Sequence, residues 1–229
     1  MKRFPVVSAA LMLALWAVPA GATSIQFQLT SDHCTGGCGL GNYGTIDVSQ
    51  SAADDVLVDV QLASGVRFVD TGFPGSFAFD LLDPDPAISV TFDSPATGWS
   101  LSSSVGGSLH FDGFGLLNYT LICDACGSGG SNPQSGPLKF HVIAPGLTPA
   151  GFLEPSTIPP GSERAYFVAD IIGPNGNTGP VGAVTYCRDT DCDPVRQLDA
   201  VPEPTSLLLL GTGLGYLVRR VRRRQPAQM

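Results

Sequence analysis

Residues 54–63, DDVLVDVQLA, decide the fold class because apolar and polar side chains alternate along them. The three valines and Leu62 fall on one face of an extended chain. The other face is mostly polar and carries Asp55, Leu57, Asp59 and Gln61. A period of two residues with β-branched side chains on one face predicts a half-buried β-strand.

The same alternation recurs along the chain on both sides of this segment. It is present in residues 25–29, 46–48, 66–68, 77–81, 88–92, 109–111, 117–121, 138–142, 165–172 and 181–186. Gly and Pro separate these runs at intervals of about eight to twelve residues, and no helical stripe precedes the tail. The sequence therefore predicts an all-β body with the architecture of a β-sandwich or jelly roll.

The first 22 residues are typical of a secretory signal peptide. Lys2 and Arg3 form a charged start, residues 6–18 form an apolar core, and Ala20-Gly21-Ala22 is a small-residue cleavage site. The apolar core is short for a membrane span, which disfavours an uncleaved anchor. We expect cleavage after Ala22 and a mature chain that begins at Thr23.

The last 29 residues contain three zones in a fixed order. An extended segment, in which two prolines resist helix formation, consists of Val201, Pro202, Glu203 and Pro204. An uncharged apolar run follows at residues 205–218, and then a basic stop made of Arg219, Arg220, Arg222, Arg223 and Arg224. Clustered arginines stay on the cytoplasmic side of a membrane, so the tail holds the chain at the inner membrane with its body outside.

These zones resemble the PEP-CTERM sorting signal of exported bacterial proteins, which has a Pro-Glu-Pro motif, a short apolar helix and a basic end. The resemblance covers about a tenth of the chain. It implies an exosortase-type sorting enzyme and, transiently, the inner membrane as partners, and it often accompanies exopolysaccharide production. The implied destination is the cell surface or the extracellular matrix.

A plain C-terminal membrane anchor is the alternative. The fourteen residues of the apolar run form a helix of about 21 Å, which is shorter than the ~30 Å hydrocarbon core and favours a transient signal. The expected organisation is a signal peptide at 1–22, a β-sandwich domain at 23–187, a linker with the PEP motif at 188–204, and a transmembrane helix with its basic end at 205–224.

Acidic residues dominate the body. Residues 23–201 contain nineteen acidic and five basic side chains. Such a body repels nucleic-acid phosphates, so nucleic acid is not an expected partner. The acidic excess favours solubility of an exported domain, or a weak attraction for divalent cations.

Six cysteines occur as three close pairs, Cys34/Cys38, Cys123/Cys126 and Cys187/Cys192. An even number in an exported chain indicates disulfides, and local pairing is the simplest of the fifteen arrangements that six cysteines allow. The alternative is a zinc site made of the first two pairs, which would supply four thiolates.

Two further groups of residues are candidates for ligand binding. Asp189, Asp191 and Asp193 recur at every second position and could converge on calcium, although Pro194 occupies the place where a glycine would allow the loop to curl. An acidic solvated loop is favoured, and no other cofactor is expected. The candidates for stacking on a sugar ring are Trp99, the body's one tryptophan, and Tyr43, Tyr119 and Tyr186, with packing in the core or at an edge as the alternative for each.

Catalytic motifs are missing from the sequence. His33, His110 and His141 do not form an HExxH motif, and there is no Gly-x-Ser-x-Gly elbow. We therefore expect a structural or adhesive protein of the surface, the extracellular matrix or a biofilm rather than an enzyme. A lectin-like module is the second hypothesis, and a secreted hydrolase that clusters a histidine with acids is the third.

Overall fold

A computed structural model describes residues 24–72, 74–83, 88–103, 109–157, 162–188 and 191–193 of the chain. Within these ranges it contains fourteen β-strands and three short 3₁₀ helices. No helix among the described residues is long and apolar enough to cross a membrane. The predicted signal peptide, sorting motif and tail helix lie outside the described residues.

The strands of the first half are β1 (Ser24–Asp32), β2 (Gly44–Ala52), β3 (Asp55–Leu62), β4 (Arg67–Phe68), β5 (Phe77–Phe79), β6 (Ser89–Ser94) and β7 (Ser100–Ser103). Those of the second half are β8 (Leu109–Phe111), β9 (Gly115–Leu117), β10 (Tyr119–Ile122), β11 (Leu138–Ile143), β12 (Phe167–Ile172), β13 (Thr178–Arg188) and β14 (Asp191–Asp193). The 3₁₀ helices are η1 (Asp124–Cys126), η2 (Ser128–Gly130) and η3 (Pro149–Phe152).

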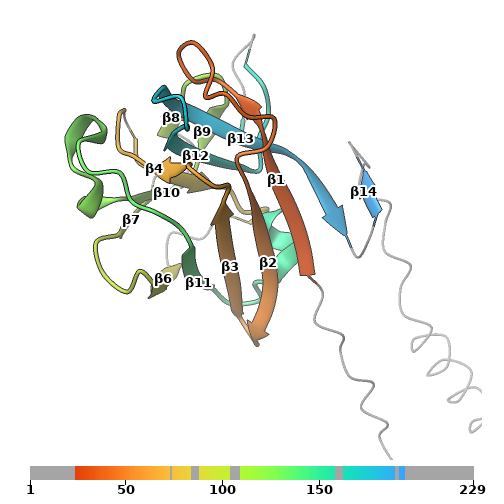
Figure 1. Cartoon of the computed structure of the whole chain (residues 1–229). Helices are drawn as coiled ribbons and strands as arrows, with labels where there is room; N and C mark the ends of the chain where they lie inside the picture. The colour runs from red at the N-terminus through yellow and green to blue at the C-terminus, as the bar shows by residue number, and fades with distance from the viewer. Residues whose placement is uncertain are drawn as a thin grey trace, which may run out of the picture. The chain divides into compact units, whose positions relative to one another are not determined.

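Twelve of the strands form one antiparallel sheet in the order β6-β11-β3-β2-β1-β13-β12-β5-β10-β7, with β14 beside β13 and β4 beside β12 (Figure 1). The strands β8 and β9 form a separate two-stranded sheet. The strand β1 lies between β2 and β13, so the first and last long strands of the body are neighbours, with Ile25 opposite Arg188.

Aromatic contacts show that the sheet folds over on itself. The ring of Phe140, on β11 near one edge, lies 5.9 Å from that of Phe77 and 6.0 Å from that of Phe79, both on the distant strand β5. The sheet is therefore curled and nearly barrel-shaped around one main core. The all-β prediction is confirmed, whereas this single curled sheet does not confirm a sandwich or jelly roll.

The strand that decides the fold class has the predicted faces. Val56, Val58 and Val60 are fully buried, whereas Asp55 and Asp59 on the other face are partly exposed. Each buried valine contributes roughly 1.5–3 kcal/mol through removal of apolar surface from water. The alternation thus fixes which face of β3 points into the core.

The end of the body differs from the prediction of a linker that begins at residue 188. The strand β13 continues to Arg188, and residues 191–193 form β14, which pairs with β13 through Cys187 and Cys192. Backbone pairing explains the difference, because a short hairpin satisfies amide groups that a linker would leave to water.

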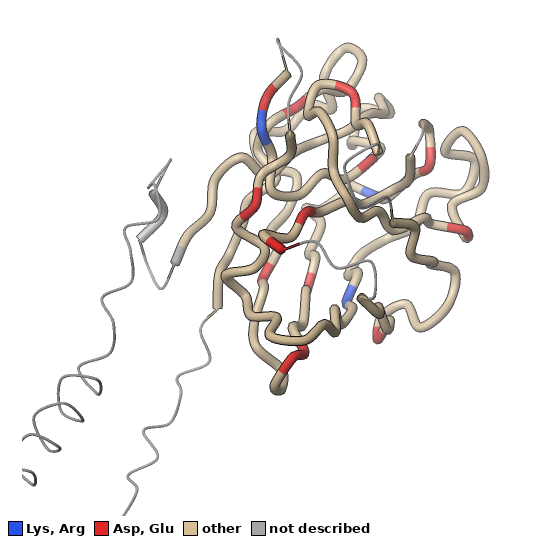
Figure 2. The backbone as a smooth tube through the Cα atoms, turned by 180° about the vertical axis from the view of Figure 1, so that it is seen from behind, with Lys and Arg blue, Asp and Glu red and all other residues tan. Residues whose placement is uncertain are grey.

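Acidic residues are spread over many strands and loops of this body, among few basic ones (Figure 2).

Candidate functional site

The candidate site lies in the loop that joins β1 to β2, residues 33–43. A disulfide links Cys34 to Cys38, with 5.5 Å between their Cα atoms. Gly36 and Gly37 inside this small ring have φ angles of 82° and 76°, a left-handed conformation that other residues rarely adopt. The two glycines therefore allow the chain to close within five residues.

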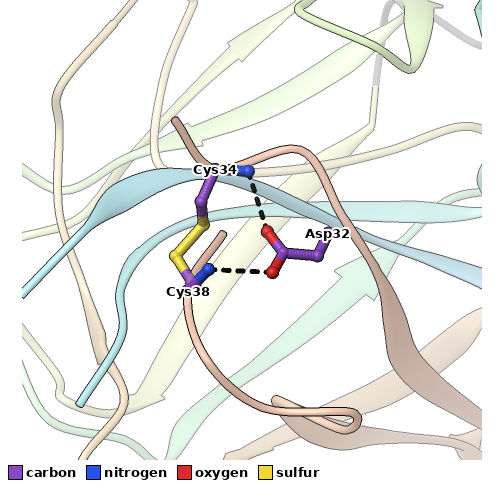
Figure 3. Close-up of side chains that lie close together, drawn as sticks. All are labelled: Asp32, Cys34 and Cys38. Carbon is purple, nitrogen blue, oxygen red and sulfur yellow. Dashed lines mark hydrogen bonds between the residues drawn. A yellow bond between two sulfur atoms is a disulfide. The ribbon is translucent and has the colours of Figure 1, made fainter. Parts of the chain in front are cut away.

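The carboxylate of Asp32, the last residue of β1, organises this loop (Figure 3). Its Oδ1 accepts a hydrogen bond from the backbone N–H of Cys34 at 2.9 Å, and its Oδ2 accepts one from the N–H of Cys38 at 2.8 Å. The buried hydroxyl of Tyr43 also donates to Oδ2, while it accepts from the N–H of Leu40 at 3.2 Å. One side chain thus satisfies both cysteine amides of the ring.

Electrostatics keep this carboxylate ionised. Burial opposes the charged form, but the hydrogen bonds from Tyr43, Cys38 and Cys34 outweigh it and hold the pKa of Asp32 below its usual value. Burial, and then the hydrogen bond to Asp32, raises the pKa of Tyr43. At neutral pH the site is therefore a carboxylate facing a neutral phenol.

The loop packs on the turn between β12 and β13. The carbonyl oxygen of Gly37 accepts hydrogen bonds from the side-chain amides of Asn175, at 2.9 Å, and Asn177, at 2.7 Å. A Cβ atom at Gly173 would overlap the carbonyl of Cys38, so glycine is required for this approach. Residues about 140 positions apart in the chain thus fix the position of the loop.

These residues also form a possible set of metal ligands. The ligand atoms of Asp32, Cys34 and Cys38 all lie within 4.8 Å of one another, the one such group of three found among the described residues. In the disulfide form the two sulfur atoms are bonded to each other and are not thiolates, which are the form that binds metal.

The second cysteine pair forms its own disulfide. Cys123 bonds to Cys126, with 5.3 Å between their Cα atoms. The four cysteines of the alternative zinc site are therefore two separate cross-links, which corrects that alternative. Cys187 is also disulfide-bonded, whereas the side chain of Cys192 lies outside the described residues.

The structure describes only part of the predicted ligand residues. Asp191 and Asp193 are in the extended strand β14 rather than in a curled loop, while Asp189 and all three side chains lie outside the described residues. Trp99 is 7% exposed and packs edge-to-face on Phe68 at 5.2 Å, as the core alternative predicts. A buried ring offers no face to a sugar, so we do not propose a sugar-binding site at Trp99.

Among the described residues, His33 and His141 contact acids, and neither belongs to a Ser-His-acid triad. Nε2 of His33 lies 3.6 Å from Oε2 of Glu163, and the hydroxyl of Ser31 donates to the same oxygen. In a Ser-His-acid triad the hydroxyl bonds to the imidazole, not to the acid. His110 is exposed, at the middle of β8.

His141 is held between two carboxylates on the outer face of the sheet. Its ring nitrogens lie 2.7 Å from Asp55 and 3.1 Å from Asp93. Burial disfavours the protonated ring, but the hydrogen bonds to Asp55 and Asp93 outweigh it and raise the pKa of His141. This arrangement joins β11 to its neighbours β3 and β6, a structural use of the histidine.

Sequence reasoning missed Asp32 and the hydrogen bond that Tyr43 donates to it. A signal for Asp32 was present, because a carboxylate two residues before an amide it can bind is typical of an Asx turn. The bond from Tyr43 has no such local signature, since eleven positions separate the two residues.

Comparison with known proteins identifies the tail. A family model described as the PEP-CTERM protein-sorting motif matches residues 200–224, which include the Pro-Glu-Pro segment and all five tail arginines. No curated protein and no solved structure matches the chain. The match confirms the resemblance drawn from the tail and implies export with sorting at the membrane. The chain therefore carries a PEP-CTERM protein-sorting motif, which supports an exported protein that is sorted by an exosortase.

Proposed function

We propose that the protein is a structural or adhesive component of the cell surface or extracellular matrix, associated with exopolysaccharide, and that it is not an enzyme. The observation that carries this proposal is the sorting motif at residues 200–224. Such a motif supplies an address for the body that precedes it. The function of the body is then exerted outside the membrane.

The chemistry of the body supports a role in an exposed, oxidising location. Cys34–Cys38 and Cys123–Cys126 are disulfides between cysteines close in sequence, and disulfides are typical of exported proteins. The strongly acidic composition keeps such a body soluble and would favour interaction with matrix polymers through bound cations. The described side chains form a packed β-structure rather than a triad, which supports a structural role over a hydrolytic one.

The sorting step is tested with the full chain expressed in a host that has an exosortase. Replacing Pro202 and Pro204 by alanine removes the extended segment, and we expect the chain to keep its tail and to stay in the inner membrane. Pro145→Ala, at an exposed proline of the body, is the matched control and leaves processing unchanged. Cell fractionation with intact-mass analysis measures both location and cut ends. Normal release of the doubly substituted chain would contradict the sorting role.

The matrix role is tested separately in cells. A strain lacking the protein should hold less matrix on its surface, and the full chain should restore it, whereas a chain without residues 201–224 should not. Matrix polysaccharide and biofilm mass measure the effect. Equal biofilm in all strains, with sorting intact, would exclude the matrix role while it leaves the address unaffected.

A further inference from the structure

The loop at residues 33–43 is held by hydrogen bonds as well as by its disulfide. The amides of Cys34 and Cys38 are held by Asp32, and the carbonyl of Gly37 is held by Asn175 and Asn177. None of these hydrogen bonds involves a sulfur atom. A disulfide across so short a ring also removes less entropy from the unfolded chain than a long-range one does. Reduction of the disulfide therefore removes none of the partners in these hydrogen bonds.

Each sulfur atom already lies near a hydrogen-bond acceptor. Sγ of Cys34 is 3.7 Å from the carbonyl oxygen of Gly179, and Sγ of Cys38 is 3.3 Å from that of Asn177. In a reduced loop these carbonyls accept hydrogen bonds from the two thiols. The dithiol form is thus compatible with the same packing against β13.

We propose that the dithiol form of this loop binds one soft divalent cation, such as Zn²⁺, through the sulfurs of Cys34 and Cys38 and a carboxylate oxygen of Asp32. The three ligand atoms already lie within 4.8 Å of one another. Bond lengths of about 2.3 Å to sulfur and about 2.0–2.2 Å to oxygen then require only small rotations of the two thiol side chains. The exposed side of Asp32 leaves room for water as the fourth ligand.

The carboxylate of Asp32 is held in place for this cation. The amides of Cys34 and Cys38 and the hydroxyl of Tyr43 donate hydrogen bonds to it, as outer partners orient the ligands of known metal sites. Oδ1, which accepts the N–H of Cys34, retains a second lone pair for a metal. The acidic body attracts cations to the site.

The site forms when an external dithiol reduces the loop. The external dithiol gives two electrons and two protons, so its own sulfurs join in a disulfide while the Cys34–Cys38 bond breaks into two thiols. Each thiol then loses its proton to solvent as it binds the cation. Oxidation by any disulfide of higher potential reverses the sequence and releases the cation.

The second disulfide offers an internal comparison. The amide of Cys123 is bonded to the hydroxyl of Ser76 at 3.3 Å, and the amide of Cys126 to the carbonyl of Cys123 at 3.0 Å. Neither group is a carboxylate, and among the described residues the one cluster of three possible metal ligands is in the first loop. Reduction of Cys123–Cys126 should therefore produce two thiols without a third metal ligand.

The test uses the full chain, reduced with a dithiol, desalted without oxygen and titrated with Cd²⁺ while the ultraviolet cadmium–thiolate band is measured. We expect tight binding of one cation by the reduced chain and none by the oxidised chain. Asp32→Asn should weaken binding about tenfold or more. Glu163→Gln makes the same chemical change at an exposed carboxylate close to the loop, and it should leave affinity within about twofold.

A measurement on the unmodified chain guards against a variant that does not fold. Zn²⁺ added to the reduced chain should slow alkylation of Cys34 and Cys38, located by peptide mass analysis, while Cys123 and Cys126 react as before. Equal protection of both pairs, or no protection of either, would overturn the proposal. Binding to Asp32→Asn as tight as to the parent chain would do the same.

Discussion

Two disulfide loops of the body, at Cys34–Cys38 and Cys123–Cys126, have nearly the same covalent design and different support. Cys34–Cys38 spans four positions and Cys123–Cys126 spans three, with similar distances between their Cα atoms. In the first loop the ring amides bond to the carboxylate of Asp32, which lies outside the ring. In the second, one ring amide bonds to a carbonyl inside the ring and the other to the neutral hydroxyl of Ser76.

This difference shows that two cysteines close in sequence predict a disulfide bond, but they do not predict which hydrogen bonds support the loop between them. Hydrogen bonds to an ionised acceptor are roughly twice as strong as those between neutral groups. The first loop therefore depends on one charged acceptor, whereas the second depends on a neutral hydroxyl and a carbonyl of its own ring. Each of the following experiments tests that contrast.

The largest expected effect comes from removal of the acceptor itself. Asp32→Ala should lower the free energy of unfolding by about 2–3 kcal/mol, because two backbone amides and the hydroxyl of Tyr43 lose their partner. Ser76→Ala, the matching cut in the second loop, should cost about 1 kcal/mol. Urea unfolding of both oxidised variants measures the two values. Equal losses would remove the contrast.

Removal of the disulfides comes next. Replacing either cysteine pair by serine should cost about 2 kcal/mol, because the two rings are almost equally short. The local consequences should differ. The amide of Cys38 keeps its acceptor when residue 38 becomes serine, whereas the amide of Cys126 has its acceptor inside the opened ring. Hydrogen exchange should stay slow at position 38 and become faster at position 126; the opposite order would contradict this interpretation.

Local periodicity explains why the strands could be predicted from the sequence. Val56, Val58 and Val60 lie on one face of β3 because alternation is a property of consecutive residues. Closure of the sheet could not be predicted in this way. The contact of Phe140 with Phe77 joins strands that are far apart in the chain, and no periodicity encodes which strands will face each other.

The candidate site was predictable only in part. The spacing of Cys34 and Cys38 indicates a local disulfide, and the structure has this bond. The role of Asp32 depends on backbone amides, which every residue except proline carries, so no residue type marks the donors. The contacts of Asn175 and Asn177 with the loop depend on the neighbouring positions of β1 and β13 in the folded sheet.

A second carboxylate sharpens the comparison by responding in the opposite direction. Asp80 is buried, and burial raises its pKa to about 6 although Asn118 and the N–H of Leu81 donate to it. A raised acid pKa means that stability falls as the pH rises from about 4 through about 6. Asp80→Asn should therefore stabilise the protein at pH 7 by about 1–2 kcal/mol, and this gain should vanish near pH 4.

The control is the same substitution at Asp32, which should destabilise the protein at pH 7 because that carboxylate is favoured in its charged form. The Asn side chain at position 80 can keep both hydrogen bonds, since both donors bond to the single atom Oδ1. Thermal unfolding at pH 7 and at pH 4 measures both variants. If both substitutions changed the stability at pH 7 in the same direction, the hydrogen-bond donors around Asp32 and Asp80 would not decide which carboxylate is favoured in its charged form.

The smallest effect is a change in the amide signals of the first loop with pH. Because the folded state holds the pKa of Asp32 below its usual value, the stability it contributes is present above about pH 4 and is lost as the pH falls through the lowered value. The amide signals of Cys34 and Cys38 in NMR spectra should therefore shift together, with a midpoint below about pH 4. The amide of Cys126, which bonds to a carbonyl, loses no acceptor in this transition. A midpoint for the Cys38 amide above about pH 4 would mean that the donors around Asp32 do not outweigh its burial.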